Sequence, residues 1–218
     1  MATLRVAAEP ELALMKVAQI SKPGADFEVV EREIPEPARG QVRIKVQACG
    51  VCHSDVFTKE GSWPGIQYPR IRGHEVAGSI DAVGAGVSEW KEGAARRRRL
   101  AGGHDGTCRA CQRGDFRNCR NLKVPGISYD GGYQQYMLDP VEAGVGIPDT
   151  LNNVEAAPLL CAGVTTFDAL RHSGALPGNF AALTGVRPMT ETYPLEKAGE
   201  AYARMMSGKA RFRVVLTM

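Results

Sequence analysis

The chain has no long apolar run and no large surplus of charge of either sign. None of its segments approaches the roughly 18 apolar residues that a membrane span requires. Glu9, Pro10 and Glu11 stand where the apolar core of a signal peptide would lie. The formal net charge of the 218 residues is +3, which indicates no particular partner. We therefore expect a soluble, cytoplasmic protein with no membrane partner.

A second absence concerns the glycine-rich turn that holds the pyrophosphate of a dinucleotide. Such a turn carries glycines in the pattern Gly-x-Gly-x-x-Gly between a strand and a helix. The only Gly-x-Gly in a suggestive position is formed by Gly84 and Gly86, and Glu89 stands where the third glycine is needed. We expect this segment not to bind a dinucleotide.

Short apolar segments separated by glycine and proline dominate the first hundred residues. Val42, Ile44 and Val46 alternate with polar residues, which predicts a strand with one buried face. A second, mostly apolar run covers 76–83 and ends at Gly84. Many short strands with frequent breaks predict a barrel-like β domain.

The rest of the chain adds a loop, two helical regions and a last strand. Segment 102–123 has few apolar side chains and is expected to be a loop, and strand resumes over 131–137. An amphipathic helix is expected over about 194–208 and a closing strand over 211–218. Helical spacing predicts a helix over 153–172, and its apolar residues are Leu159, Leu160, Val164, Phe167 and Leu170. The fold class is therefore mainly β with a few helices.

The cysteines indicate metal binding. There are six, mostly in Cys-x-x-Cys pairs, and in an intracellular protein this favours metal over disulfides. Two thiolates, from Cys52 and Cys161, and the imidazole of His74 could hold zinc and leave one coordination position open, as catalytic zinc sites do. Of the first pair we favour Cys52 and interpret Cys49 as a bystander. Asp55 is the natural hydrogen-bond partner for His74.

The hypothesis of a catalytic zinc site rests on the combination, because Cys161 alone would be interpreted as a small core residue. Four motifs then resemble the zinc-dependent medium-chain alcohol dehydrogenases, and they cover 52–55, 73–78, 83–87 and 160–166. The resemblance extends over about 15–178 and again over about 180–218. It implies a GroES-like catalytic domain, a partly open β-barrel, with zinc held by Cys52, His74 and Cys161.

The resemblance also implies roles for neighbouring residues. Glu75 would lie behind the metal as an occasional alternative ligand, and Ser54 would take the proton of a small alcohol substrate. In several relatives a histidine five residues after the first zinc cysteine continues this relay. Here that residue is Phe57, so the relay would end in water or in a hydroxyl of the NAD(P) cofactor.

A second metal constellation lies in segment 102–123. Cys108 and Cys111 form a Cys-x-x-Cys pair and Cys119 follows, which resembles the beginning of a structural zinc lobe. The family places another cysteine three residues before the pair, where this chain has Asp105. A carboxylate oxygen can replace a sulfur, so these four residues would bind zinc, although more weakly than four thiolates. The alternative is three reduced cysteines without a metal.

The family continues with a Rossmann domain after the segment that ends here at Gly178. In this chain Gly178 is followed at once by residues that resemble the family's C-terminal return, so we expect no complete Rossmann domain. We expect residues 1–178 to form the GroES-like catalytic domain, with the zinc lobe at about 102–123. Residues 179–218 would add the helix and strand that complete it. NAD(P)-dependent turnover by this chain alone should then be impaired.

Several alternatives remain open. The run Arg96–Arg99 cannot face a core, so it indicates a remodelled strand, an exposed loop or a local change of reading frame. We interpret the basic charge around it as a solvated face and expect no nucleic-acid partner. Instead of an oxidoreductase, the zinc could serve a hydrolase or hydratase. The chain could also be a non-catalytic, zinc-stabilised module that self-associates through an exposed apolar face.

Overall fold

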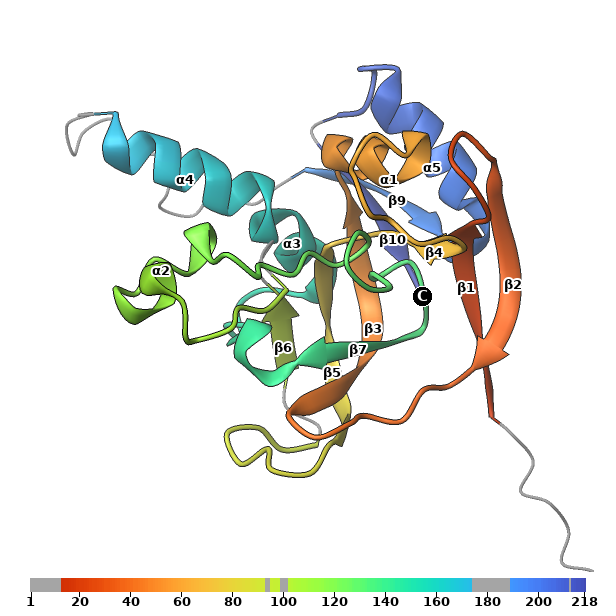
Figure 1. Ribbon diagram of the computed structural model, residues 1–218. Helices are drawn as coiled ribbons and strands as arrows, with labels where there is room; N and C mark the ends of the chain where they lie inside the picture. The colour runs from red at the N-terminus through yellow and green to blue at the C-terminus, as the bar shows by residue number, and fades with distance from the viewer. Residues whose placement is uncertain (1–12, 93–94, 99–101, 174–188, 212) are drawn as a thin grey trace, which may run out of the picture.

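The computed structural model describes residues 13–92, 95–98, 102–173, 189–211 and 213–218 (Figure 1). As expected, strands predominate over helices. The strands are β1 (Leu14–Ile20), β2 (Phe27–Glu33), β3 (Gln41–Val51), β4 (Arg70–Ile71), β5 (Glu75–Val83), β6 (Ala95–Arg98), β7 (Tyr136–Pro140), β8 (Gly144–Gly146), β9 (Thr190–Pro194) and β10 (Arg213–Thr217). The α-helices are α1 (Val56–Glu60), α2 (Arg109–Gln112), α3 (Asn153–Ala156), α4 (Ala162–His172) and α5 (Ala198–Met206).

The strands form two sheets. A three-stranded antiparallel sheet has the order β2-β1-β4. A seven-stranded sheet has the order β8-β6-β5-β3-β10-β9, and β7 also pairs with β3. Along one edge of β3, β7 pairs with its first half and β10 with its second half. Within the described residues the two sheets do not join into a closed ring of strands.

Strand β3 is the centre of the core. Val42, Ile44 and Val46 are buried and Lys45 between them is exposed, so the predicted alternation is confirmed. The same face meets buried residues of β1, β5 and β10 in one hydrophobic cluster. β3 makes its longest ladder with β5, from Val42–Val83 to Gly50–Glu75. This ladder brings the end of β3 beside the beginning of β5, where the site lies.

The strand expected over 131–137 begins later, as β7 at Tyr136. The preceding glycines are used for close backbone contact instead. A Cβ on Gly131 would lie 2.2 Å from the carbonyl oxygen of Gly73, and one on Gly132 would lie 2.9 Å from the sulfur of Cys49. This packing holds Tyr133 in the core, behind the site.

The helix expected over 153–172 is three separate pieces. These are α3, the 3₁₀ turn η4 (Ala157–Leu160) and α4, and the backbone breaks at Cys161 with φ −121° and ψ −69°. No residue of α4 is buried, and Val164 and Phe167 are 46% and 43% exposed. Figure 1 shows α4 extending away from the sheets. Among the described residues, the part of the predicted apolar stripe that lies on α4 therefore has no covering element, whereas Leu160 of η4 is buried.

The C-terminal elements follow the predicted pattern more closely. The expected amphipathic helix is the 3₁₀ turn η6 (Leu195–Lys197) followed by α5. Leu195, Ala198 and Ala201 are buried against the core, whereas Met206 at the end of α5 is 42% exposed. The closing strand is β10, which pairs antiparallel with β3 and parallel with β9.

The arginine run forms a strand as far as the structure describes it. The backbone of β6 pairs with β5 on one side and with β8 on the other, while Arg99 lies outside the described residues. The junction between Gly178 and Asn179 also lies outside them. Among the described helices, none has the length and apolar character needed to cross a membrane.

Candidate metal centre

Three segments that are distant in sequence meet at one end of the larger sheet. Cys52 follows β3 directly and precedes the 3₁₀ turn η1 (His53–Asp55). His74 precedes β5, and the pairing of Gly50 with Glu75 places it beside the end of β3. Cys161 follows η4, which packs against both β3 and β5.

The potential ligand atoms of these segments converge. One atom each from Cys52, His74, Glu75 and Cys161 lies within 4.8 Å of all the others. The sulfurs of Cys52 and Cys161 are 3.8 Å apart, and both cysteines are free. Two sulfurs bound to one zinc at about 2.3 Å and a tetrahedral angle would be about 3.8 Å apart. The donor set and its spacing therefore fit a zinc ion.

The orientation of the His74 ring is set by Asp55. Its Nδ1 lies 3.4 Å from Oδ1 of Asp55, and both side chains are buried. The other carboxylate oxygen accepts hydrogen bonds from the backbone N–H of Cys52 at 3.0 Å and from the hydroxyl of Tyr133 at 2.9 Å. Nε2 of His74 is left on the side of the hydroxyl of Ser54, at 3.4 Å. Asp55 thus has the geometry expected of the partner that fixes a metal-binding imidazole.

The cluster separates charge when no metal neutralises it. The hydrogen bond from Cys161 lowers the pKa of the Cys52 thiol to about 3, against the opposing effect of burial and with further help from His74. Burial acts to lower the pKa of His74, but hydrogen bonds with Asp55 and Cys52 outweigh it and raise this pKa to about 10. The hydrogen bond to Cys52 and burial raise the pKa of Cys161. At neutral pH the cluster then holds one thiolate, one thiol and one imidazolium.

Glu75 lies fully buried behind these ligands. Neither carboxylate oxygen has a hydrogen-bond partner among the described residues, although Nη2 of Arg213 is 3.6 Å from Oε1. Burial is the main cause that raises the pKa of this carboxyl to about 8. The side chain fits only because residue 50 is glycine, since a Cβ there would lie 1.8 Å from Oε2. An orphaned, buried carboxyl beside three ligand atoms suits an alternative metal ligand.

The second constellation also converges. Ligand atoms of Asp105, Cys108, Cys111 and Cys119 lie within 4.8 Å of one another. α2 begins directly after Cys108, and the 3₁₀ turn η2 (Phe116–Asn118) ends directly before Cys119. The sulfurs of Cys108 and Cys111 are 3.5 Å apart, and the backbone N–H of Asp105 donates to the sulfur of Cys119 at 3.4 Å. A structural zinc ion fits this donor set as well.

Asp105 is strongly held in its position. Oδ1 accepts the backbone N–H groups of Thr107 and Cys108, both at 2.9 Å, and Oδ2 accepts the amide of Asn121 at 2.8 Å. These hydrogen bonds, the one from Cys108 first, lower the pKa of Asp105. The carboxylate is therefore ionised and available as an oxygen ligand, but it shares its lone pairs with three donors.

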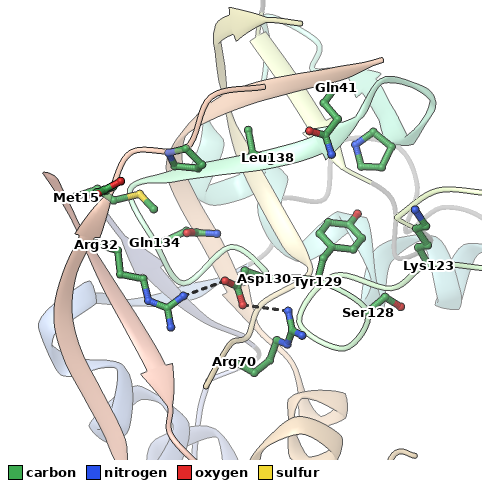
Figure 2. A pocket seen from close by; sticks show the side chains of 13 residues that line it. Met15, Arg32, Gln41, Arg70, Lys123, Ser128, Tyr129, Asp130, Gln134 and Leu138 are labelled. Atoms are coloured by element: carbon green, nitrogen blue, oxygen red, sulfur yellow. Dashed lines mark hydrogen bonds and ion pairs between the residues drawn. The ribbon is translucent and has the colours of Figure 1, made fainter. Parts of the chain in front are cut away.

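A cavity lies apart from both clusters. Its volume is about 480 Å³, and its lining includes neither cluster's ligands. Figure 2 shows Arg32 and Arg70 on either side of Asp130, which bonds to both at 3.1 and 3.2 Å. Asp130 also accepts the backbone N–H of Ile71. This network joins the smaller sheet to the loop before β7.

Comparison with known proteins agrees with this geometry. Residues 38–149 match the family described as the alcohol dehydrogenase GroES-like domain. The chain belongs to the medium-chain zinc alcohol dehydrogenase family. Alcohol dehydrogenase patD of Penicillium expansum is 44% identical over 171 residues, which are 78% of this chain and 50% of that relative. The chain thus spans about half the length of the curated relatives it matches.

Solved structures of family members show the same fold. RspB of E. coli CFT073, a short chain alcohol dehydrogenase complexed with NADH, is 36% identical with a TM-score of 0.61. That alignment covers 67% of this chain and 42% of the other. The cinnamyl alcohol dehydrogenase SbCAD4 of Sorghum bicolor aligns with a TM-score of 0.81 at 17% identity, over 94% of this chain and 98% of that one. At that identity the likeness concerns the fold alone.

The structure brings together most of the residues that the sequence singled out. Ser54 lies beside the first cluster, with its hydroxyl 3.2 Å from the sulfur of Cys52. Cys49 is buried but outside both clusters. Phe57 is exposed and packs edge-on against Trp63, with ring centroids 5.7 Å apart.

Three residues around the first cluster were missed by sequence reasoning. Tyr133 and Arg213 contact Asp55 and Glu75 from distant parts of the chain, and no local pattern announces them. Arg72 was missed as well, because nothing in the sequence around it indicates that its side chain is buried.

Loading of the first cluster should release protons. Because His74 and Cys161 are protonated near neutral pH and ligands must be deprotonated, zinc binding at pH 7 should displace about two protons at this cluster. Affinity should accordingly rise with pH, and above the pKa of His74 it should rise less steeply, because Cys161 alone still has to lose its proton. Calorimetric titration in buffers of different ionisation enthalpy measures the number released. In Cys161→Ser, which should no longer hold zinc at this cluster, the proton release that belongs to the cluster should disappear; equal proton release from both proteins would contradict this assignment.

Proposed function

We propose that this chain is the zinc-binding catalytic part of an alcohol dehydrogenase-like oxidoreductase that interconverts small alcohols and aldehydes. The observation that carries the proposal is the convergence of Cys52, His74 and Cys161 at the spacing of shared metal ligands. We further propose that 1–178 is a partly open GroES-like barrel with a structural zinc lobe at about 102–123. We also propose that residues 179–218 complete that domain and that the described residues contain no complete Rossmann domain.

The chain's own residues would divide the work as follows. A bound zinc ion would polarise the substrate oxygen and ease the loss of its proton. Cys52, His74 and Cys161 would hold that ion, and Glu75 would be available as an alternative ligand. The hydroxyl of Ser54, within 3.4 Å of both Cys52 and His74, would take the proton from the substrate. Phe57 cannot pass a proton on, so Ser54 would release its own proton to water or to a hydroxyl of the NAD(P) cofactor.

Hydride transfer is the step that this chain is poorly equipped to perform alone. The step requires a nicotinamide held close to its reactive geometry. The described residues include no Gly-x-Gly-x-x-Gly turn, and Glu89 occupies the third position of the nearest candidate. We therefore infer that NAD(P) binds weakly and that turnover by the isolated chain is impaired.

Metal content tests the ligand assignments. The wild-type chain should carry about two zinc ions, as expected for one catalytic and one structural site. Cys161→Ser should lower the content by about one, because it removes a ligand of the first cluster. Cys49→Ser is the control, since Cys49 is a buried cysteine outside both clusters, and it should change nothing. Mass spectrometry of dialysed protein measures the content, and identical values for the two variants would refute the first site.

A cofactor assay tests the impaired turnover. NADH with a small aldehyde and the zinc-loaded chain should show no zinc-dependent loss of NADH absorbance. Chelator-treated protein provides the baseline. A robust rate that disappears with chelator and falls in Ser54→Ala would contradict the impairment, while supporting Ser54 as the proton acceptor.

A second candidate function is a zinc-stabilised module that self-associates. The observation that favours it is the exposure of Val164 and Phe167 on a helix with no buried residue. Such apolar faces commonly meet a partner. Light scattering should then show a concentration-dependent increase in mass that is lost in Phe167→Ser. Met206→Ser, at a similarly exposed methionine on α5, should leave the mass unchanged. A monomer at high concentration would exclude this function.

A further inference from the structure

Arg72 is a fully buried arginine beside the first metal cluster. Among the described residues its side chain makes one hydrogen bond, from Nη1 to the backbone carbonyl of Asp55 at 2.7 Å. Nε and Nη2 are buried without a hydrogen-bond partner among the described residues. Burying a charged group with unpaired hydrogen-bond donors costs free energy. An apolar side chain would fill the same space at a lower cost. The burial of Arg72 must therefore be explained by the groups around it.

Aromatic rings replace the missing hydrogen bonds in part. The guanidinium carbon of Arg72 lies 4.5 Å from the ring centroid of Phe27 in β2 and 4.5 Å from that of Tyr202 in α5. The ring of Tyr133 is 5.6 Å away. Cation–π contacts of this kind hold a guanidinium plane in one orientation. The side chain is thereby directed at Asp55 and has no freedom to turn to solvent.

Arg72 bonds to Asp55, which is the residue that orients His74. The backbone carbonyl of Asp55 accepts a hydrogen bond from Arg72. Its carboxylate accepts hydrogen bonds from the hydroxyl of Tyr133 and the N–H of Cys52, and it lies beside the imidazole of His74. Arg72 thus bonds to the last residue of the turn η1. Its positive charge also lies near the buried carboxylate, which favours the ionised form that a metal-bound imidazole needs as a partner.

We propose that Arg72 is a positioning residue for the first metal cluster. Clamped between Phe27 and Tyr202, it holds Asp55 so that the carboxylate keeps Nε2 of His74 turned toward the two thiols. Through Tyr202, α5 is connected to the cluster even though it supplies no ligand. This inference rests on the proposed zinc site, and it concerns how firmly the site is preorganised rather than which residues bind.

The chain offers a matched control for a buried arginine. Arg70 lies two residues earlier, is 9% exposed, and bonds to Asp130 instead of Asp55 (Figure 2). Arg70→Met also removes a buried cation, with its bonds to Asp130 and to the backbone carbonyl of Gln67, but it leaves Asp55 untouched. Loss of general stability would therefore affect both variants, whereas loss of metal positioning would affect Arg72→Met alone.

Cobalt(II) provides the readout, because its visible absorption reports ligand geometry without any turnover. The absorption that Cys161→Ser lacks is assigned to the first cluster. In Arg72→Met the cobalt dissociation constant of that cluster should rise by about tenfold or more, as is typical when a supporting hydrogen-bond partner is lost. The visible bands should also shift, and Arg72→Lys should restore part of the affinity. Arg70→Met should match the wild type in both measurements.

The outcomes separate this inference from the proposed function. Absence of any such cobalt absorption in the wild type would refute the metal site itself. A wild-type site with unchanged affinity and bands in Arg72→Met, or with equal weakening in Arg70→Met, would overturn the role of Arg72. If Arg72→Met does not fold, Tyr202→Leu is the second test. It removes one of the aromatic rings that contact the guanidinium, and Tyr202 is only partly buried. Cobalt affinity and bands unchanged in that variant would equally overturn the inference.

Discussion

The buried carboxylate of Asp55 is the constraint on which the first metal cluster depends. Its two oxygens bind the N–H of Cys52, the hydroxyl of Tyr133 and the imidazole of His74, which come from three separate segments. A single side chain thus sets the turn after β3, the entry to β5 and the loop before β7. Because the carboxylate only accepts hydrogen bonds, Nδ1 of His74 must donate, and Nε2 remains for a metal.

Charge balance explains why a divalent ion suits this buried place. In the metal-free state the thiolate of Cys52 faces the imidazolium of His74, and the carboxylate of Asp55 faces the guanidinium of Arg72. Binding of an ion of charge +2 requires His74 and Cys161 to lose one proton each. The total charge of the buried region is then the same before and after loading. A low-dielectric site can therefore exchange protons for metal without burying additional net charge.

Local sequence patterns predicted most of the strands and helices, whereas the burial and the partners of individual side chains depended on tertiary packing. The alternation in β3 and the ligand motifs around Cys52 and His74 could be recognised from sequence, because burial of one strand face and metal chemistry both restrict residue type at fixed spacing. The exposure of Val164 could not, because helical periodicity says which residues share a face and nothing about what covers it. Tyr133 was missed since its partner, Asp55, lies far away in the chain.

The last elements of the chain supply support to the site rather than ligands. Arg213, at the beginning of β10, lies 3.6 Å from the orphaned carboxyl of Glu75, and Tyr202 of α5 covers the guanidinium of Arg72. Without these two contacts a buried carboxyl would lose a cation that lies 3.6 Å away, and a buried cation would lose one of its aromatic contacts. Both losses would destabilise the packing directly behind the metal ligands, where small displacements alter coordination geometry. The pairing of β10 with β3 is therefore part of the preorganisation of the metal cluster, in addition to its contribution to the core.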